Sequence, residues 1–560
     1  MKIVLAQQNY HIGNFEKNTQ KIIAAIEEAK QQHADLIVFS EMCVCGYPAR
    51  DFVEFHDFID KCYQAINKIK QHADTIGVLV GSPARNPVFE GKDLFNAAFL
   101  LYEKEIKAEV HKTLLPTYDV FDEYRYFEPA YNWNVVEFKG KRLAVTICED
   151  IWNIDDNPLY RISPMDMLME QKPDLMINLS ASPFDYIHAE ERKSVIKANV
   201  LKYNLPMFYC NAVGSQTEIV FDGASLVFDK EGHLCKCFPS FEEAVEAVRL
   251  KDDGTIEETE KDTIRPISHI KPNPVHYDPT LNIKGIHTAL IHGIRDYFQK
   301  MGFKKAIIGS SGGIDSAVTL ALACDALGKE NVRAILMPSP YSTSHSVNDA
   351  VQLSENLENP YDIIKIKDIY EAFLSTLKPI FKDLPFSIAE ENIQSRTRGN
   401  LLMAIANKFG YILLNTSNKS ELATGYGTLY GDMAGGIGVL GDCYKLQVYA
   451  LAEYINRDRE IIPNNIIHKA PSAELRPDQK DADSLPEYDV LDKVLYQYIE
   501  RRQGPNEIKA QGVEPALVDR ILKLVNSNEY KRNQFCPIIR VSPKAFGVGR
   551  RVPIVGKYLS

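Results

Sequence analysis

Residues 305–316, KAIIGSSGGIDS, join a short apolar run to a loop rich in glycine and serine. The run Lys305–Ile308 predicts a buried strand, and the segment from Ala317 to Leu327, followed by Gly328, predicts a helix. A loop between a strand and a helix N-terminus suits phosphate, because backbone N–H groups and the helix dipole both favour an anion there. No Gly-Lys-Ser/Thr sequence ends the loop, so it is not a Walker loop. The stretch therefore predicts a phosphate-binding unit of another kind.

Strands and helices alternate around this loop. Further strand candidates are Ala334–Met337, Tyr361–Ile366 and Tyr411–Leu414, with helical segments between them. Such alternation predicts an α/β fold with a doubly wound parallel sheet (Rossmann-like), whose ligands bind beyond the carboxyl ends of the strands. We expect this domain to cover residues 281–560.

The chain before this domain has a different pattern, in which strands predominate over a few helices. Residues 251–280 are charged and poor in apolar side chains, and they contain four prolines, which predicts a linker. We therefore expect a separate domain over residues 1–250. Its predicted elements include helices over Phe15–Ala34 and Ala189–Leu205 and a hairpin within Phe221–Gly232.

The composition limits the possible partners and the compartment. The 560 residues carry a formal net charge of -11, which argues against non-specific nucleic-acid binding. The ten cysteines show neither zinc-knuckle spacing nor the density of a disulfide framework, so we expect a reducing, cytoplasmic environment. No segment approaches the roughly 18 apolar residues of a membrane span. We expect neither a nucleic-acid nor a membrane partner.

Three polar residues in the N-terminal part each follow an apolar strand candidate: Glu41, Lys112 and Cys148. Strand ends are places where a layered fold can bring distant residues together. Cysteine, glutamate and lysine would supply the nucleophile, base and cation of covalent amide hydrolysis. Taken singly, a cysteine in this position is more often a buried packing residue than a nucleophile. A single glutamate or lysine is more often a solvent-exposed surface residue than a catalytic one.

The loop motif Ser-Gly-Gly-x-Asp-Ser resembles the pyrophosphate loop of the ATP pyrophosphatases, a group that includes the NAD, GMP and asparagine synthetases. Three further stretches resemble NAD synthetases and occur in the same order. These are residues 396–400 (RTRGN), 414–432 (LNTSNKSELATGYGTLYGD) and 470–477 (APSAELRP). Together they indicate an NAD synthetase far more specifically than the loop alone.

This resemblance implies roles for individual residues. The implied ATP contacts are Gly309, Ser310, Ser311, Gly312, Gly313, Ile314, Asp315, Ser316, Thr416 and Lys445. Asn392, Glu421 and Lys531 match contacts to deamido-NAD, and Asp315 and Glu421 match ligands of Mg²⁺. Leu429 departs from the pattern, because the ammonia-dependent enzymes have a substrate-binding lysine there.

The N-terminal part resembles the nitrilase superfamily, through Phe39–Glu41 with Gly46–Pro48, Lys112–Pro116 and Cys148–Asp150. Residues 121–129 are similar to the glutaminase domain of NAD synthetases. The resemblance implies an α-β-β-α sandwich in which Glu123 orients the lysine. It also implies glutamine contacts at Tyr118, Ser182 and His188, of which His188 stands where the family has lysine.

The combined resemblance implies a glutamine-dependent NAD synthetase. Ammonia released from glutamine through a Cys148 thioester would convert deamido-NAD, activated by ATP as an acyl-adenylate, to NAD, with release of AMP, pyrophosphate and glutamate. It further implies ammonia channelling and a homo-oligomer, dimeric or larger. Two alternatives stay open: a nitrilase-type amidase fused to an adenylating amidotransferase for another carboxylate, and a non-catalytic nucleotide-sensing or ammonia-binding module.

Overall fold

A computed structural model of the chain describes residues 1–558 except 155–157, 258–275, 473, 478, 480 and 484. The chain divides into two compact units, Met1–Lys271 and Pro272–Ser560. Most of the predicted linker, residues 251–280, lies outside the described residues.

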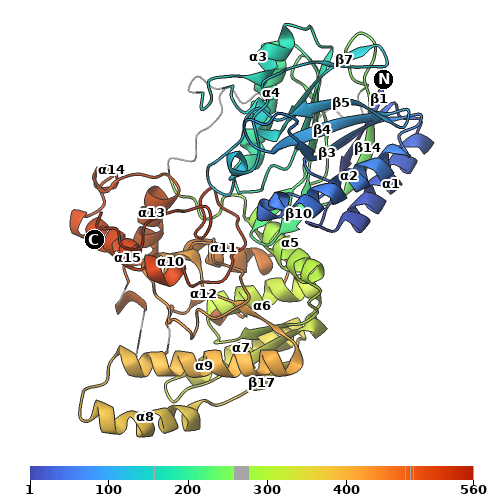
Figure 1. Cartoon of the computed structure of the whole chain (residues 1–560). Coiled ribbons are helices and arrows are strands. Elements are labelled where there is room, and N and C mark those ends of the chain that lie inside the picture. The colour runs from blue at the N-terminus through green and yellow to red at the C-terminus, as the bar shows by residue number, and fades with distance from the viewer. Residues whose placement is uncertain are drawn as a thin grey trace. The chain divides into compact units, whose positions relative to one another are not determined.

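Two six-stranded mixed sheets face each other in the first unit, and helices cover the outer face of each (Figure 1). The first sheet has the order β14 (Ala244–Arg249), β1 (Lys2–Gln7), β2 (Leu36–Phe39), β3 (Gly77–Arg85), β4 (Leu94–Tyr102) and β5 (Glu105–His111). The second has the order β13 (Leu234–Cys237), β12 (Leu226–Phe228), β9 (Met207–Asn211), β8 (Leu175–Ser180), β7 (Lys141–Ile147) and β6 (Val136–Phe138). A separate antiparallel pair joins β10 (Val213–Gln216) and β11 (Ile219–Asp222).

The alternation of side chains along the strands fills both sides of each sheet. Ile3 and Leu5 of β1 lie in the core between the sheets, whereas Val4 and Ala6 pack toward the helices α1 (Phe15–Gln31) and α2 (His56–Lys70). The second sheet packs its outer face on α3 (Pro164–Met169) and α4 (His188–Tyr203). The predicted α-β-β-α sandwich is therefore confirmed. Short 3₁₀ helices are η1 (Arg50–Glu54), η2 (Glu123–Arg125) and η3 (Cys148–Ile151).

The hairpin expected within Phe221–Gly232 is displaced. The structure forms one hairpin from β10 and β11, which ends at Asp222, and a second from β12 and β13. Gly232, where the expected hairpin ended, instead lies in the turn between β12 and β13. Its φ of +82° explains this place, because only glycine adopts such a backbone conformation at no steric cost.

The second unit contains a five-stranded sheet in which every neighbouring pair is parallel, so the doubly wound architecture is also confirmed. Its order is β17 (Tyr361–Ile363), β16 (Val332–Leu336), β15 (Ala306–Gly309), β18 (Ile412–Asn415) and β19 (Ile437–Gly438). From β15 the chain first adds β16 and β17 on one side of the sheet, and it then returns to add β18 and β19 on the other side. Open α/β sheets bind ligands at such a switch point, which here lies between β15 and β18.

Helices pack around this sheet and form a further bundle near the C-terminus (Figure 1). They are α5 (Ile283–Met301), α6 (Ile314–Leu327), η4 (Lys329–Asn331), α7 (Ser344–Leu357), α8 (Lys367–Phe381), α9 (Ile388–Phe409), α10 (Lys419–Thr424), α11 (Lys445–Ile455), α12 (Asn464–His468), η5 (Asp481–Asp483), α13 (Tyr488–Ile499), α14 (Pro505–Lys509), α15 (Pro515–Ser527) and α16 (Glu529–Arg532). In the part of the chain that the structure describes, none of the helices is both long enough and apolar enough to span a membrane.

Candidate active sites

Three charged side chains meet in the first unit where strand ends converge. Lys112 follows β5, Glu41 lies just after β2, and Glu123 begins η2. The Lys112 Nζ lies 2.7 Å from Glu41 Oε1 and 2.8 Å from Glu123 Oε1, and all three residues are buried. Burial alone would lower the pKa of Lys112, but the carboxylates of Glu123 and Glu41 hold it well above its ordinary value. The lysine therefore stays cationic inside the protein, where a charge needs partners of this kind.

Uncharged groups fix the two carboxylates. The Asn96 amide donates from Nδ2 to Glu41 Oε1 at 2.7 Å and to Glu123 Oε2 at 3.2 Å. The Tyr47 hydroxyl donates to Glu123 at 2.7 Å, and the backbone N–H of Ala181 donates to Glu41 at 3.1 Å. Asn96 was not predicted from the sequence, although an amide inside the apolar strand β4 was a usable signal.

Cys148 lies in the same neighbourhood, at the junction of β7 and η3. Its backbone φ of +41° is rare for a residue with a side chain and marks local strain, which is common at functional sites. Burial, followed by the negative charge of Glu41, raises the pKa of the Cys148 thiol well above its ordinary value. At neutral pH the residue is a thiol, so it needs a base before it can act as a nucleophile.

Asp150 ties the loop after Lys112 to the end of β7. Its carboxylate accepts hydrogen bonds from the backbone N–H groups of Thr113, Leu114 and Ile147, at 2.9, 2.8 and 3.0 Å. Burial raises its pKa to about 7 despite these bonds. Asp150 thereby joins the backbone that follows Lys112 to the backbone that precedes Cys148, a contact that the sequence motif alone did not reveal.

The residues expected to contact glutamine fall into two groups. Tyr118 donates its hydroxyl proton to the carboxylate of Glu149, the neighbour of Cys148, at 2.9 Å. The Ser182 hydroxyl and the His188 Nε2 lie 2.8 Å apart, and the imidazole stacks on the indole of Trp152. Burial raises the pKa of Glu149, and Lys112 and His188 are among the groups that oppose this shift. Tyr118 and His188 therefore both act on Glu149, the residue next to Cys148.

A cavity of about 1020 Å³ opens at the switch point of the second unit. Strand-end residues of β15, β16 and β18 line it, together with residues of α9 and the loops that follow α10. The predicted site residues that line it are Gly309, Ser310, Ser311, Gly313, Ile314, Asp315, Ser316, Asn392, Thr416, Glu421, Lys445 and Lys531.

Gly312 contacts α7 and is not one of the cavity-lining residues. It has a φ of +75°, and a Cβ atom there would lie 2.2 Å from the carbonyl oxygen of Ser346. Its absent side chain thus permits a close packing of two backbones. Within the loop, the Ser316 hydroxyl donates to Gly313 O at 2.9 Å, whereas the buried Ser310 hydroxyl has no hydrogen-bond partner among the described residues. Ser310 is therefore the serine left available to a ligand.

Two carboxylates share one ammonium beside the loop. The Lys445 Nζ lies 2.5 Å from Asp315 Oδ2 and 3.6 Å from Glu421 Oε1, and Asn418 donates to Asp315 Oδ1 at 2.8 Å. Burial and the charge of Asp315 raise the pKa of Glu421 to about 8. The Lys445 ammonium thus faces two carboxyl groups, whose oxygen atoms are the ligand type that Mg²⁺ prefers.

Two residues expected to contact deamido-NAD hold the loop after α10. The Lys531 ammonium donates to the carbonyl oxygens of Gly425 and Gly427 at 2.7 and 2.8 Å, and the Asn392 Oδ1 accepts a hydrogen bond from Thr428 at 2.7 Å. Burial lowers the pKa of Lys531. Leu429, the position where the sequence departs from the ammonia-dependent enzymes, lies in this loop and lines the cavity.

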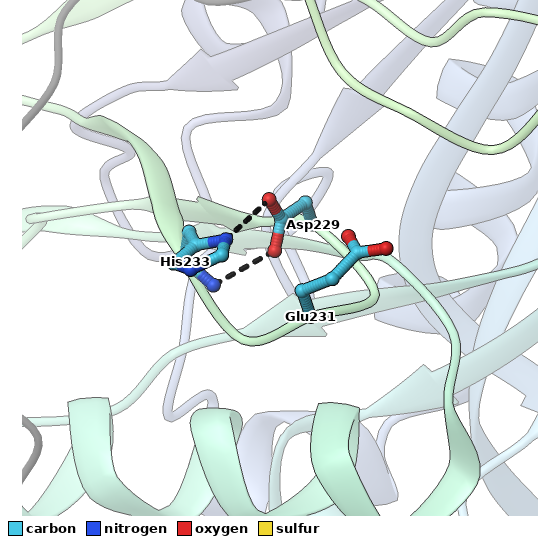
Figure 2. Close-up of side chains that lie close together, drawn as sticks. All are labelled: Asp229, Glu231 and His233. Atoms are coloured by element: carbon cyan, nitrogen blue, oxygen red, sulfur yellow. Dashed lines mark hydrogen bonds and ion pairs between the residues drawn. The ribbon is translucent and has the colours of Figure 1, made fainter.

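A third cluster of polar side chains lies in the turn between β12 and β13. Asp229, Glu231 and His233 place potential metal-ligating atoms within 4.8 Å of one another. Figure 2 shows that Asp229 accepts hydrogen bonds from the backbone N–H and the Nδ1 of His233, whereas no such bond reaches Glu231. These bonds are those of a tight hairpin turn, and we assign the cluster to the fold.

Two family models match the chain. The carbon-nitrogen hydrolase model matches residues 2–253, and the NAD synthase model matches residues 286–535. The glutamine-dependent NAD(+) synthetase of Synechocystis sp. is 42% identical over 559 residues, which cover 99% of this chain and 98% of the relative. The protein of the same name from Thermotoga maritima is 40% identical over 579 residues, covering 100% and 99%.

Solved structures agree with these relatives. That of a glutamine-dependent NAD+ synthetase from Acinetobacter baumannii, in complex with ADP, matches with a TM-score of 0.76 and 36% identity, covering 99% of this chain and 98% of that one. A structure from Cytophaga hutchinsonii matches with a TM-score of 0.80 at 19% identity and shows that the fold is shared. Likeness at this level runs through both units, so the two alternatives left open by the sequence have no support.

Proposed function

The chain belongs to the glutamine-dependent NAD+ synthetases, ATP-using enzymes that amidate deamido-NAD with nitrogen from glutamine, and we propose how its two units divide that reaction. We assign the glutaminase to residues 1–250, a linker to 251–280 and the synthetase to 281–560. In support, β14 ends at Arg249 and α5 begins at Ile283. The observation that carries the proposal is that each unit has its own set of reacting groups: Cys148 with a base and a cation, and the phosphate loop with a cavity.

In the glutaminase, Glu41 takes the proton of Cys148 as the sulfur attacks the side-chain carbonyl of glutamine. The Lys112 ammonium and the backbone N–H of Glu149 hold the negative charge that forms on the carbonyl oxygen. Glu41 returns the proton to the departing ammonia, and a thioester remains on Cys148. Water, deprotonated by Glu41, then releases glutamate. Glu123 keeps Lys112 in place, which the 2.8 Å ion pair supports.

In the synthetase, the carboxylate of deamido-NAD attacks the α-phosphate of ATP and displaces pyrophosphate. This step is needed because a free carboxylate would have to expel oxide to form an amide. Ammonia then attacks the acyl-adenylate, and AMP leaves. Backbone N–H groups of the loop, Ser310, Thr416 and Lys445 stabilise the phosphates, and Asn392, Glu421 and Lys531 contact the dinucleotide.

Mg²⁺ fits the pair Asp315 and Glu421. Both offer hard oxygen ligands near the phosphate loop, and the crowding of their charges around Lys445 is what a divalent cation would relieve. When bound, Mg²⁺ would neutralise the charge of the phosphates in adenylation.

The direct test is to incubate the protein with ATP, Mg²⁺, deamido-NAD and glutamine. We expect NAD, glutamate, AMP and pyrophosphate to form in matching amounts, measured by liquid chromatography and mass spectrometry. Omission of ATP should stop NAD formation, because the carboxylate is then not activated. Consumption of ATP and glutamine without NAD, or with another carboxylate in preference to deamido-NAD, would contradict the proposal.

We also propose a homo-oligomer, dimeric or larger, in a cytoplasmic environment. Exposed apolar side chains gather on α8 and α9 of the synthetase, which supports an interface between copies. They are Ile369, Phe373, Ile380, Ile388, Met403 and Phe409. The buried Cys43, Cys62 and Cys148 are thiols and not disulfides, in keeping with a reducing compartment.

Ammonia travels inside the protein in our proposal. We propose this because one chain carries both a domain that releases ammonia and a domain that consumes it. In water at neutral pH, ammonia is mostly ammonium, since its pKa is close to that of a lysine amine, about 10. Ammonium has no lone pair and cannot attack the adenylate, whereas a dry passage disfavours the unpaired cation.

Isotopic competition tests this channelling. Glutamine labelled with ¹⁵N in its amide is supplied together with excess unlabelled ammonium, and the NAD product is weighed by mass spectrometry. We expect mostly ¹⁵N-labelled NAD, because the channelled nitrogen does not mix with the solvent. Label diluted to the ratio of the bulk ammonium would reject channelling.

A further inference from the structure

A serine hydroxyl lies beside the nucleophile, on the neighbouring strand of the second sheet. The strands β7 and β8 run parallel, and Ile147 at the end of β7 pairs with Leu179 of β8. The next position along each strand therefore puts Cys148 beside Ser180, the last residue of β8. Ser180 is fully buried, so water does not compete for its hydroxyl.

The hydroxyl of Ser180 acts on the sulfur of Cys148. Burial and then the charge of Glu41 raise the pKa of the Cys148 thiol, whereas the charge of Lys112 and a hydrogen bond from the Ser180 side chain lower it. A bond that lowers the pKa of a thiol is one that favours the thiolate. Ser180 is therefore on the side of the charged nucleophile.

A tyrosine fixes the direction of this hydrogen bond. Tyr209, on the next strand β9, donates its hydroxyl proton to Ser180 Oγ at 2.8 Å, and its side chain is fully buried. Because Ser180 Oγ accepts from the tyrosine, the serine's own proton is left for another acceptor, which is the sulfur of Cys148. Hydrogen bonds in such a chain polarise one another, so Ser180 becomes a stronger donor.

A buried guanidinium lies at the other end of this chain of hydroxyls. Arg192 of α4 pairs with Asp222 at 2.6 Å, but in the part of the chain that the structure describes its Nε and Nη1 have no hydrogen-bond partner. Burial raises the pKa of Tyr209, and the positive charge of Arg192 opposes this shift. The guanidinium thus polarises the tyrosine hydroxyl toward donation.

The proposed reaction needs such a donor because it creates a buried anion twice. Sulfur becomes negative when Glu41 takes its proton, and again when water releases glutamate from the thioester. A buried anion without partners is costly. The Lys112 ammonium is already shared between Glu41 and Glu123, at 2.7 and 2.8 Å. A hydroxyl aimed at the sulfur lowers the cost of both steps.

We propose that Ser180 is a catalytic residue of the glutaminase: its hydroxyl, polarised by Tyr209, donates a hydrogen bond to Cys148 Sγ and stabilises the thiolate. The inference rests on the proposed role of Cys148 as the nucleophile. No bond of Ser180 breaks in the reaction, since the proton of the thiol still passes to Glu41.

Tyr209 has a second neighbour, which the test has to separate. A hydrogen bond with the side chain of Ser182, an expected glutamine contact, also acts on the tyrosine hydroxyl. Loss of Tyr209 therefore affects glutamine binding through Ser182 and the chemical steps through Ser180. The first effect appears in the KM for glutamine, and the second in kcat.

The test measures glutamate formation against glutamine concentration, in the full-length enzyme with saturating ATP, Mg²⁺ and deamido-NAD. In Ser180→Ala we expect kcat to fall about 10-fold or more, because a hydrogen bond to a charged group is lost, and KM to change less than about twofold. Tyr209→Phe should lower kcat by a smaller factor. The double variant should have the kcat of Ser180→Ala alone, because Tyr209 acts on the sulfur only through Ser180.

A second measurement reports the thiolate directly. The rate at which iodoacetamide alkylates Cys148 is followed between about pH 7 and pH 9 by mass spectrometry of peptides, because the thiolate is the reacting form. We expect Ser180→Ala to react about threefold more slowly or less at each pH, since part of the lost thiolate is offset by its higher nucleophilicity. Glu41, Lys112 and Glu149 act on the sulfur in both proteins, so a comparison at equal pH isolates Ser180.

Ser82→Ala is the matched control. Ser82 is a buried serine of β3 whose hydroxyl has no hydrogen-bond partner among the described residues, and its loss should leave kcat and alkylation unchanged. The rate with ammonium salts should be the same in all these variants.

A Ser180→Ala variant with wild-type kcat and a wild-type alkylation rate would overturn the inference, as would losses in the double variant that multiply. If Ser180→Ala does not fold, Tyr209→Phe decides, because an unchanged kcat in that variant excludes the relay. Failure of the proposed function is a different result: the wild type forms no glutamate, or Cys148→Ala forms it at the full rate.

Discussion

Replacing Cys148 with alanine is expected to lower NAD formation from glutamine by at least about 10⁴-fold, since no other group can form the thioester. Ammonium salts should still support synthesis, because we assign formation of the acyl-adenylate to the other unit. Both rates are measured as NAD formed from deamido-NAD and ATP, with either glutamine or ammonium as the nitrogen source. The size of the loss follows from the proposed role of Cys148 as the nucleophile, because the methyl group of alanine cannot form a thioester.

Cys237→Ala is the matched control for this loss. Cys237 is an exposed thiol at the end of β13, and its removal should leave both rates unchanged. A Cys148→Ala variant that keeps its full glutamine-dependent rate would show that another group is the nucleophile. If the variant lost the ammonia-dependent rate as well and melted at a lower temperature, the loss would reflect the fold and not the chemistry.

The convergence of the candidate site residues could be predicted because their signals are local. Glu41, Lys112 and Cys148 each follow an apolar strand, and the ends of such strands meet at one edge of a layered fold. The phosphate loop is likewise set by one strand, two glycines and one helix. The doubly wound sheet followed from the alternation of strands and helices, which requires no knowledge of distant contacts.

The partners of these residues could not be predicted, because they come from distant parts of the chain. Asn96 reaches Glu41 from 55 residues away, and nothing in its own sequence neighbourhood specifies that contact. Lys419 shows even more clearly that burial and ion pairs can depend on distant parts of the chain. A lysine at the start of a short helix is ordinarily a surface residue, yet this one is fully buried against Asp442 and Glu500, at 2.9 and 2.8 Å.

Replacing Asp315 with alanine is expected to lower NAD formation with both nitrogen donors, by about 10²-fold or more. Asp315 lies in the first turn of α6, beside the phosphate loop, where it accepts a hydrogen bond from Asn418 and pairs with Lys445. Its loss leaves Lys445 with the more distant Glu421 and leaves the proposed Mg²⁺ with one carboxylate. Adenylation then fails before either source of ammonia matters. The measurements are pyrophosphate release and NAD formation; glutamine hydrolysis should survive at least in part.

Asp315→Asn separates the charge of this residue from its shape. The amide keeps the size of the side chain and an oxygen that can accept from Asn418, but it removes the negative charge that pairs with Lys445 and holds a cation. If charge is what Asp315 supplies, both variants lose synthesis, and added Mg²⁺ restores the asparagine variant more than the alanine variant. Asp362→Asn is the control, because Asp362 pairs with Arg333 and is not among the described residues that line the cavity. Wild-type pyrophosphate release by either Asp315 variant would contradict the role, because adenylation would then proceed without the carboxylate.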